Sequence, residues 1–159
     1  MTDISAPSAL DAVVGDPTTV VVPAAGLSLL LKHAEHAVRL RLSVLLGQAD
    51  LNLEHWRILS VLLTQPGLRM STIAESAVVP PATLTRLMDT LVERALVVRR
   101  VDPDDKRRVV AALSDHGRKF AEQVKVQEQA LEELLIQRLG PDRTENLLRD
   151  LTVLPHVLG

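Results

Sequence analysis

Cysteine is absent from the 159 residues of this chain, and aromatic residues are nearly absent. Without a thiol, the chain forms no disulfide, no thiolate metal site and no thiol-based redox sensor. Its aromatic side chains are limited to Trp56 and Phe120. Proteins that bind single-stranded nucleic acids stack bases on aromatic side chains, so this scarcity argues against single-stranded DNA or RNA loops as ligands.

Long apolar runs are also missing. No stretch is long enough to span a membrane, and no basic segment precedes an apolar run at the N-terminus. We therefore expect no membrane partner, no secretory signal and a cytoplasmic location. The 47% content of apolar residues is typical of a globular protein, and the length suits one domain with a substantial core.

Recognisable catalytic motifs are missing as well. We find no Ser-His-Asp order, no glycine loop that could hold a phosphate and no paired carboxylates in a recognisable cleft. The five histidines are scattered, and the spacing of His33 and His36 is only a weak indication of a metal site. We expect no catalytic residues, no metal site, no cofactor and no enzymatic activity.

Apolar residues recur at helical spacing over most of the chain. Residues 1–23 lack this period and are expected to form a flexible arm. We expect Gly47 to end the first helix and Pro155 to end the last one, Ser71 or Thr72 to cap the third with Glu75 in a capping box, and Ser114 to cap the fifth. The predicted helices are Ala24–Leu46, Leu53–Gln65, Thr72–Ala77, Pro81–Ala95, Asp115–Leu139 and Asp142–Leu154.

A charged turn is the most informative local feature. Two β-prone runs, Leu96–Arg100 and Val109–Leu113, flank the Pro- and Asp-rich segment Asp102–Arg108, a pattern typical of a β-hairpin. The chain carries a net charge of −2, but residues 94–108 hold six cations and three anions, a local charge of +3. Such a basic patch indicates a negatively charged partner.

The helix that begins at Pro81 lies directly upstream of this hairpin. Its apolar set follows the i, i+3, i+4, i+7, i+8 pattern, and its opposite face begins with small and hydroxyl side chains followed by Arg86. Short side chains allow close approach to a DNA major groove, and arginine can reach guanine or phosphate. The residues expected to contact DNA are Pro81, Ala82, Thr83, Thr85, Arg86, Lys106, Arg107 and Arg108.

The order of elements predicts a mainly α fold with a small β-hairpin, namely a winged helix-turn-helix flanked by N- and C-terminal dimerisation helices. We expect a single domain over residues 24–159, with the winged helix-turn-helix at 51–113. The outer helices, at 24–50 and 114–159, carry apolar stripes that need a partner, and a second copy of the chain would supply one.

Five blocks of the sequence, in order and with suitable gaps, resemble the multiple-antibiotic-resistance regulator (MarR) family. These blocks are Arg69–Glu75, Ala82–Leu91, Arg94–Val97, Asp102–Arg107 and Leu113–Gly117. The resemblance implies a homodimeric winged-helix transcriptional regulator. Such proteins usually repress, bind pseudo-palindromic double-stranded DNA operators and often respond to small phenolic or anionic effectors.

The resemblance also implies roles for single residues. Arg107 falls where the family inserts an arginine into the minor groove, and Asp105 where an aspartate helps hold the wing. From the residues alone, Arg107 could pair with Asp105 or Asp102, so we expect both acids to structure the wing. Lys106 stands where arginine is common. Ala95 stands where glycine is common, so we expect the chain to turn there without a positive φ.

Each assignment has an alternative. The charged turn and the outward face of the Pro81–Ala95 helix could simply be solvated, and Arg99 and Arg100 could contact phosphate or brace the wing. Trp56 fits core packing better than the wall of a ligand pocket, to which His33 would also belong. A winged-helix module that binds protein and never DNA is the alternative function.

Overall fold

The structure is a computed structural model that describes residues 26–102, 105 and 108–159. The chain divides into two compact units, one made of residues 1–33 and 135–159 and the other of residues 34–134. The proposed N-terminal arm lies outside the described residues. The elements in chain order are α1 (Leu27–Gln48), α2 (Leu53–Thr64), β1 (Leu68–Arg69), α3 (Met70–Ala77), α4 (Pro81–Glu93), β2 (Val97–Val101), β3 (Val109–Leu113), α5 (Asp115–Leu139) and α6 (Pro141–Leu158).

The predicted fold class is confirmed, since helices dominate and the strands form one small antiparallel sheet in the order β1-β3-β2. β2 and β3 form the expected hairpin, in a register that pairs Val97 with Leu113 and Val101 with Val109. β1 was not predicted, because two residues are too few to show a strand period. It adds an edge through the pairing of Leu68 with Ala111.

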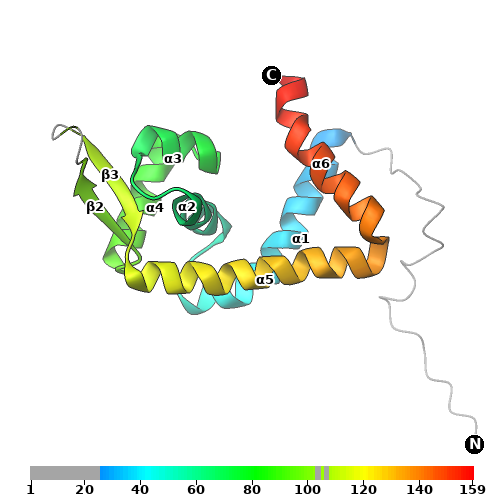
Figure 1. The fold of residues 1–159 in the computed structure, drawn as a ribbon, viewed down its shortest axis with the longest axis horizontal. Coiled ribbons are helices and arrows are strands. Elements are labelled where there is room, and N and C mark those ends of the chain that lie inside the picture. The colour runs from blue at the N-terminus through cyan, green and yellow to red at the C-terminus, as the bar shows by residue number, and fades with distance from the viewer. Residues whose placement is uncertain (1–25, 103–104, 106–107) are drawn as a thin grey trace, which may run out of the picture. The chain divides into compact units, whose positions relative to one another are not determined.

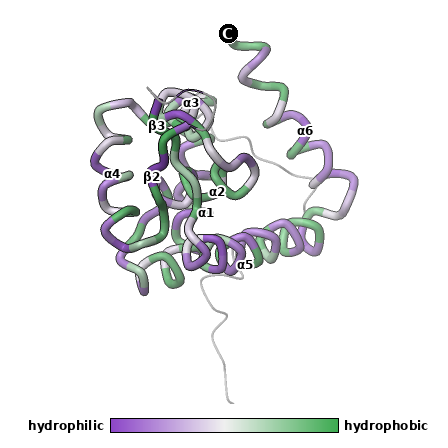
Figure 2. The backbone as a smooth tube through the Cα atoms, turned by 60° about the vertical axis from the view of Figure 1, so that its left-hand side comes forward, coloured by the Kyte–Doolittle hydropathy of each residue, from purple (hydrophilic) through white to green (hydrophobic). Residues whose placement is uncertain are grey.

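The core of the 34–134 unit lies among α2, α3, α4 and one face of the sheet (Figure 1). Leu84, Leu87, Met88 and Leu91 of α4, at the spacing i, i+3, i+4 and i+7, face this core. α1 and α5 add apolar residues to it. Figure 2 shows alternating hydrophilic and hydrophobic stretches along α5, as expected of a helix with one buried face. The largest fully buried side chains include Trp56, Ile58, Leu59, Leu62, Ile73, Leu84, Met88, Leu91, Leu96 and Val97.

Three helices end in a left-handed residue that is not glycine. Asp50 after α1, Val78 after α3 and Ala95 after α4 all have φ near +53°. In each case the next residue donates its N–H five residues back, for example from Leu96 to the carbonyl of Leu91 at 2.9 Å. This is the Schellman termination, and a side chain in this conformation costs roughly 1–2 kcal/mol.

Two expectations about glycine are therefore wrong. Gly47 lies inside α1, which ends at Gln48, and the left-handed residue that terminates the helix is Asp50. Ala95 does adopt a positive φ of 54°, because the buried Leu96 must follow the last turn of α4 at once to start β2. The position of β2 in the fold therefore determines the left-handed backbone conformation of Ala95, despite the steric cost of its Cβ.

Two further helix boundaries were misjudged. α3 begins at Met70 without any side-chain cap, because β1 leads straight into it; Ser71 and Thr72 lie in its first turn and no capping box forms. α6 does not end at Pro155 but continues to Leu158 with the proline inside it. The Gly159 N–H donates to the Pro155 carbonyl at 3.1 Å, which adds the last turn.

The start of α5 packs unusually closely on the chain before β2. Ser114 caps α5 as predicted, since its hydroxyl accepts from the Gly117 N–H at 2.8 Å and donates to the Ala95 carbonyl at 2.6 Å. The Ser114 N–H donates to the carbonyl of Leu96 at 3.0 Å. A Cβ on Gly117 would lie 1.8 Å from the same oxygen, so only glycine fits.

The unit of residues 1–33 and 135–159 exposes many apolar side chains. Its described residues come from the first part of α1, the end of α5 and α6. Among them only Thr144 is buried, with its hydroxyl bonded to the Gly140 carbonyl at 2.9 Å. The exposed large apolar residues are Leu27, Leu29, Leu30, Leu31, Ile136, Leu147, Leu148, Leu151, Val153, Val157 and Leu158. None of the helices within the described ranges is long and apolar enough to cross a membrane.

We predict that Gly117→Ala lowers the free energy of unfolding by about 3 kcal/mol, because the added methyl overlaps backbone atoms that cannot rotate away. Urea denaturation of the purified protein measures this loss. The matched control is Gly47→Ala, since Gly47 lies in a helix with open space around its Cα. That variant should gain up to about 1 kcal/mol. Equal stability of the two variants would contradict the close approach.

Candidate nucleic-acid interface

α4 presents an outward stripe that changes in chemistry along its length. Its buried side is formed by Leu84, Leu87, Met88 and Leu91. At 3.6 residues per turn, the stripe farthest from this side holds Ala82, Arg86, Asp89 and Glu93, all exposed. The first half of the stripe is therefore small or cationic, and the second half is acidic. Only the first half suits a polyanion.

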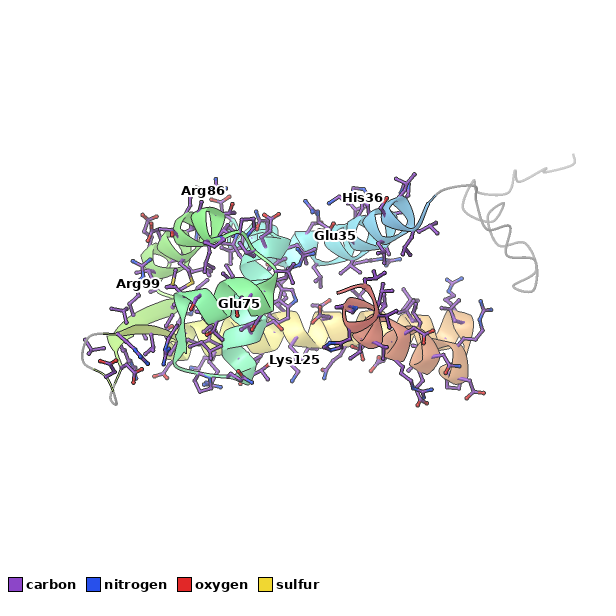
Figure 3. The ribbon with its side chains drawn as sticks, turned by 90° about the horizontal axis from the view of Figure 1, so that it is seen from above. Glu35, His36, Glu75, Arg86, Arg99 and Lys125 are labelled. Carbon is purple, nitrogen blue, oxygen red and sulfur yellow. The ribbon has the colours of Figure 1, made fainter. Side chains whose placement is uncertain are left out.

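The predicted contact residues of α4 gather in its first two turns. Pro81, Ala82, Thr85 and Arg86 are exposed, and Thr83 is half-buried. The Thr85 hydroxyl donates to the Pro81 carbonyl at 3.3 Å. Figure 3 shows Arg86 on the outer side of α4, and within the described residues it forms no ion pair. Arg86 is thus available to a ligand.

A salt bridge joins α4 to the wing. Arg99 of β2 donates through Nη2 to Oδ1 of Asp89 on α4 at 2.6 Å. Of the two roles considered for Arg99, this geometry is that of a brace. Both side chains are about half exposed, so the pair contributes no more than about 1 kcal/mol. Arg100 is exposed on the next position of the same strand.

The described residues of the wing tip form a closed turn. The Asp102 N–H donates to the Arg108 carbonyl at 2.8 Å, and the Arg108 N–H donates to the Asp105 carbonyl at 2.9 Å. Nε of Arg108 also lies 2.7 Å from Oδ2 of Asp105. This geometry suits the structuring role assigned to both acids. Lys106 and Arg107 lie outside the described residues.

Sequence reasoning missed the role of His55. Asn52 caps α2 and forms a capping box with it: the His55 N–H donates to Oδ1 of Asn52 at 3.1 Å, and Nδ1 of His55 accepts from the Asn52 N–H at 3.2 Å. The signal was present as an Asn three residues before a polar side chain, but histidine is not the usual partner. The ring is buried, and its Nε2 has no hydrogen-bond partner among the described residues.

Burial lowers the pKa of His55 below its ordinary value of 6.5. The nearby Glu54 and Asp50 raise this pKa, whereas Arg94 and Arg86 lower it. The loss of hydration prevails, so the imidazole is neutral in the fold at pH 7. Arg94 is itself held by Asp50, with Nη2 at 2.6 Å from Oδ2.

The two residues suggested for a small ligand fall in different units. Trp56 is 2% exposed in the core, and its indole Nε1 donates to Oε1 of Glu128 at 3.2 Å. Trp56 therefore packs in the core, as the sequence predicted. His33 is exposed on α1 and belongs to the other unit. A ligand role for either side chain stays a prediction.

A hollow of about 390 Å³ lies elsewhere, beside the hairpin. It is lined by Pro66, Gly67, Arg100, Val101, Val110 and Ala112. Neither Trp56 nor His33 contributes to it. Over the described ranges, no three His, Asp or Glu side chains are grouped so that they could hold a metal ion.

Comparison with known proteins finds similarity to transcriptional regulators over the residues that form α2, α3, α4 and the wing. The model of the MarR family matches residues 49–108, which hold α2 through the wing tip. The chain is 30% identical over 100 residues to the HTH-type transcriptional regulator FarR of Neisseria gonorrhoeae. This match spans 63% of the chain and 68% of that protein.

Solved structures of regulators are similar over most of the chain. The repressor CouR of Rhodococcus jostii, bound to a 23-mer DNA duplex, is 26% identical with a TM-score of 0.72 and covers 82% of this chain and 92% of its own. NadR in complex with 4-hydroxyphenylacetate is also 26% identical, with a TM-score of 0.69 and coverages of 80% and 90%.

We predict that acid destabilises the protein partly through His55. The unfolded chain binds the proton more tightly than the fold does, so the stabilisation is complete above pH 6.5 and is lost as the pH falls through the lower pKa of the folded state. Urea unfolding at several values between pH 7.5 and pH 5 measures this loss.

His55→Gln should flatten that pH dependence, because glutamine completes a capping box without titrating. His36→Gln, at an exposed histidine of α1, is the control and should leave the wild-type profile unchanged. If His55→Gln and His36→Gln show the same loss with pH as the wild type, then His55 is not the group responsible.

Proposed function

The chain belongs to the MarR family of transcriptional regulators, and from this premise we propose that it is a homodimeric repressor that binds a pseudo-palindromic operator and is released by a small ligand. The observation that carries the proposal is the outward face of α4. Its exposed small residues and Arg86 lie on the helix that the Asp89–Arg99 ion pair joins to the wing, and the sequence of the wing carries a cationic segment. Winged-helix proteins read DNA with this pair of elements.

We assign the first half of α4 to the major groove. Pro81 and Ala82 allow the helix to approach the base edges, and Thr83, Thr85 and Arg86 supply most of the sequence choice. Asp89 and Glu93 farther along the stripe repel phosphate, which favours insertion by the N-terminal end. The half-buried position of Thr83 makes it the least accessible of the set.

We assign the wing to the adjacent minor groove. Lys106, Arg107 and Arg108 would meet the DNA there, while Asp102 and Asp105 hold the turn through their contacts with Arg108. Cations that neutralise phosphates add affinity for any sequence and make binding weaken with salt. The Arg99–Asp89 pair adds a weak contact that orients the wing toward α4.

Dimerisation is proposed through the outer helices, at residues 24–50 and 114–159. The exposed apolar side chains of α1 and α6 support this, because a surface of this kind needs a partner. A two-fold dimer places two copies of α4 on one face of the duplex, about 34 Å apart. Operator symmetry then follows from protein symmetry.

An effector is proposed by comparison. NadR, which is similar to this chain, is known in complex with 4-hydroxyphenylacetate, a small phenolic acid. A ligand of this class would release DNA by binding better to a dimer whose two reading helices have the wrong spacing. Trp56 and His33 are the residues we would vary first in a search for its site.

Neither alternative class of function gains support. The similar proteins are transcriptional regulators, one of them bound to DNA, which disfavours a winged-helix module that binds only protein. We further propose that the chain has no catalytic activity. This proposal rests on the family, because a transcriptional regulator acts through binding.

Arg86→Ala and Lys106→Ala should weaken DNA binding in different ways. Arg86→Ala should erode the preference for operator over random duplex, by about 5-fold to 150-fold, because a base contact is lost. Lys106→Ala should weaken binding to both duplexes evenly and reduce the dependence on salt by about one phosphate contact. Fluorescence titrations at two salt concentrations separate these effects.

Lys125→Ala is the matched control, since it removes one exposed cation from α5, a helix assigned to dimerisation and not to DNA contact. It should leave the preference for operator over random duplex unchanged. The reverse pattern between Arg86→Ala and Lys106→Ala would show that the two roles are misassigned, and the absence of any preference in the wild type would contradict operator binding.

A further inference from the structure

The part of α4 that is assigned to the major groove is mostly apolar. Pro81 and Ala82 are exposed, and neither side chain can donate or accept a hydrogen bond. Pro81 also lacks a backbone N–H, so the first helical position offers no donor. A base edge that contacts the side chains of Pro81 and Ala82 therefore contacts only carbon atoms.

Thr85 adds to this surface through its methyl group. Its hydroxyl donates its proton to the Pro81 carbonyl at 3.3 Å, one helical turn back. The hydroxyl is thereby directed along the helix and keeps only its acceptor lone pairs for other partners. The γ-methyl on the same Cβ points in a different staggered direction, and Thr85 is exposed.

Charge on this helix is scarce and uneven. Arg86 is the only cation among the residues of α4, and the acid next on the outward stripe, Asp89, is held by Arg99. Arg86 can recognise a guanine by two hydrogen bonds. The remaining exposed positions of the first two turns, Pro81, Ala82 and Thr85, carry no charge, and only Thr85 has a polar side-chain atom.

Among the four bases, thymine alone presents an apolar group in the major groove, its C5 methyl. We propose that Pro81, Ala82 and Thr85 recognise operator bases by apolar contact with thymine methyl groups, next to one guanine read by Arg86. This rests on the proposed function, because it requires α4 to lie in the major groove. The inference extends the proposed function by naming the bases that α4 contacts, namely thymines and one guanine.

The test begins with an operator found by the protein itself. The full chain selects its preferred duplex from a random-sequence pool, and each thymine of that duplex is then replaced singly by deoxyuridine. This replacement removes the methyl group and leaves base pairing intact. We expect one to three thymines per half-site at which the replacement weakens binding about threefold to fivefold, as for one buried methyl group. Thymines outside the half-sites serve as controls.

Two variants of Thr85 assign the contact. Thr85→Ser keeps the hydroxyl and loses the methyl, whereas Thr85→Val keeps the methyl and loses the hydroxyl. At the thymine that Thr85 contacts, Thr85→Ser should bind thymine and deoxyuridine duplexes equally, and Thr85→Val should retain the discrimination. Unfolding midpoints of both variants confirm that each is folded before binding is compared.

The possible results distinguish a failure of the thymine-methyl contacts from a failure of the proposed operator binding. Tight, sequence-preferring binding that ignores every thymine-to-deoxyuridine replacement would overturn the methyl contacts and leave operator binding intact. Discrimination that survives in Thr85→Ser and disappears in Thr85→Val would overturn the role of the Thr85 methyl. A pool that yields no preferred duplex would contradict the proposed function itself.

Discussion

The carbonyl of Leu96 is the point on which the arrangement of α4, the wing and α5 depends. Leu96 donates its own N–H to the end of α4, and its oxygen accepts from the Ser114 N–H at 3.0 Å, just after β3. The first turn of α5 then passes so close that only Gly117 fits. One buried residue, through its N–H and its carbonyl, thus fixes where α4 stops, where the wing starts and where α5 begins.

The rigidity of α4 and the wing comes from this junction and the core, not from surface charge. The Arg99–Asp89 and Arg108–Asp105 pairs are partly exposed, and such pairs contribute about 0–1 kcal/mol each. The buried residues Leu84, Met88 and Leu91 anchor α4 along its whole length. The charged pairs therefore orient the wing on a frame that already exists. This division leaves the outward face of α4 free to change chemistry without loss of the fold.

The features that the sequence predicts well are those with local causes. Helical periodicity located α2, α4, α5 and the outward face of α4, Ser114 was predicted as a cap, and the charged segment after Arg100 indicated the hairpin. The features it missed depend on distant partners. Ala95 takes a left-handed conformation because Leu96 must enter the core, and β1 exists only because β3 is beside it. The His55 cap was missed because histidine replaces the usual partner. The DNA contacts of Lys106 and Arg107 remain predictions, and both residues lie outside the described part of the chain.

We propose that two copies of α4 and its wing read one duplex together. A hydroxyl-radical footprint of the full chain on its selected operator tests this most directly, because the reagent reports which sugars the protein covers. We expect two symmetric protected segments on one face of the duplex, about one helical turn apart, each flanked by protection of an adjacent minor groove. A single asymmetric segment, or protection without the flanking minor grooves, would contradict it.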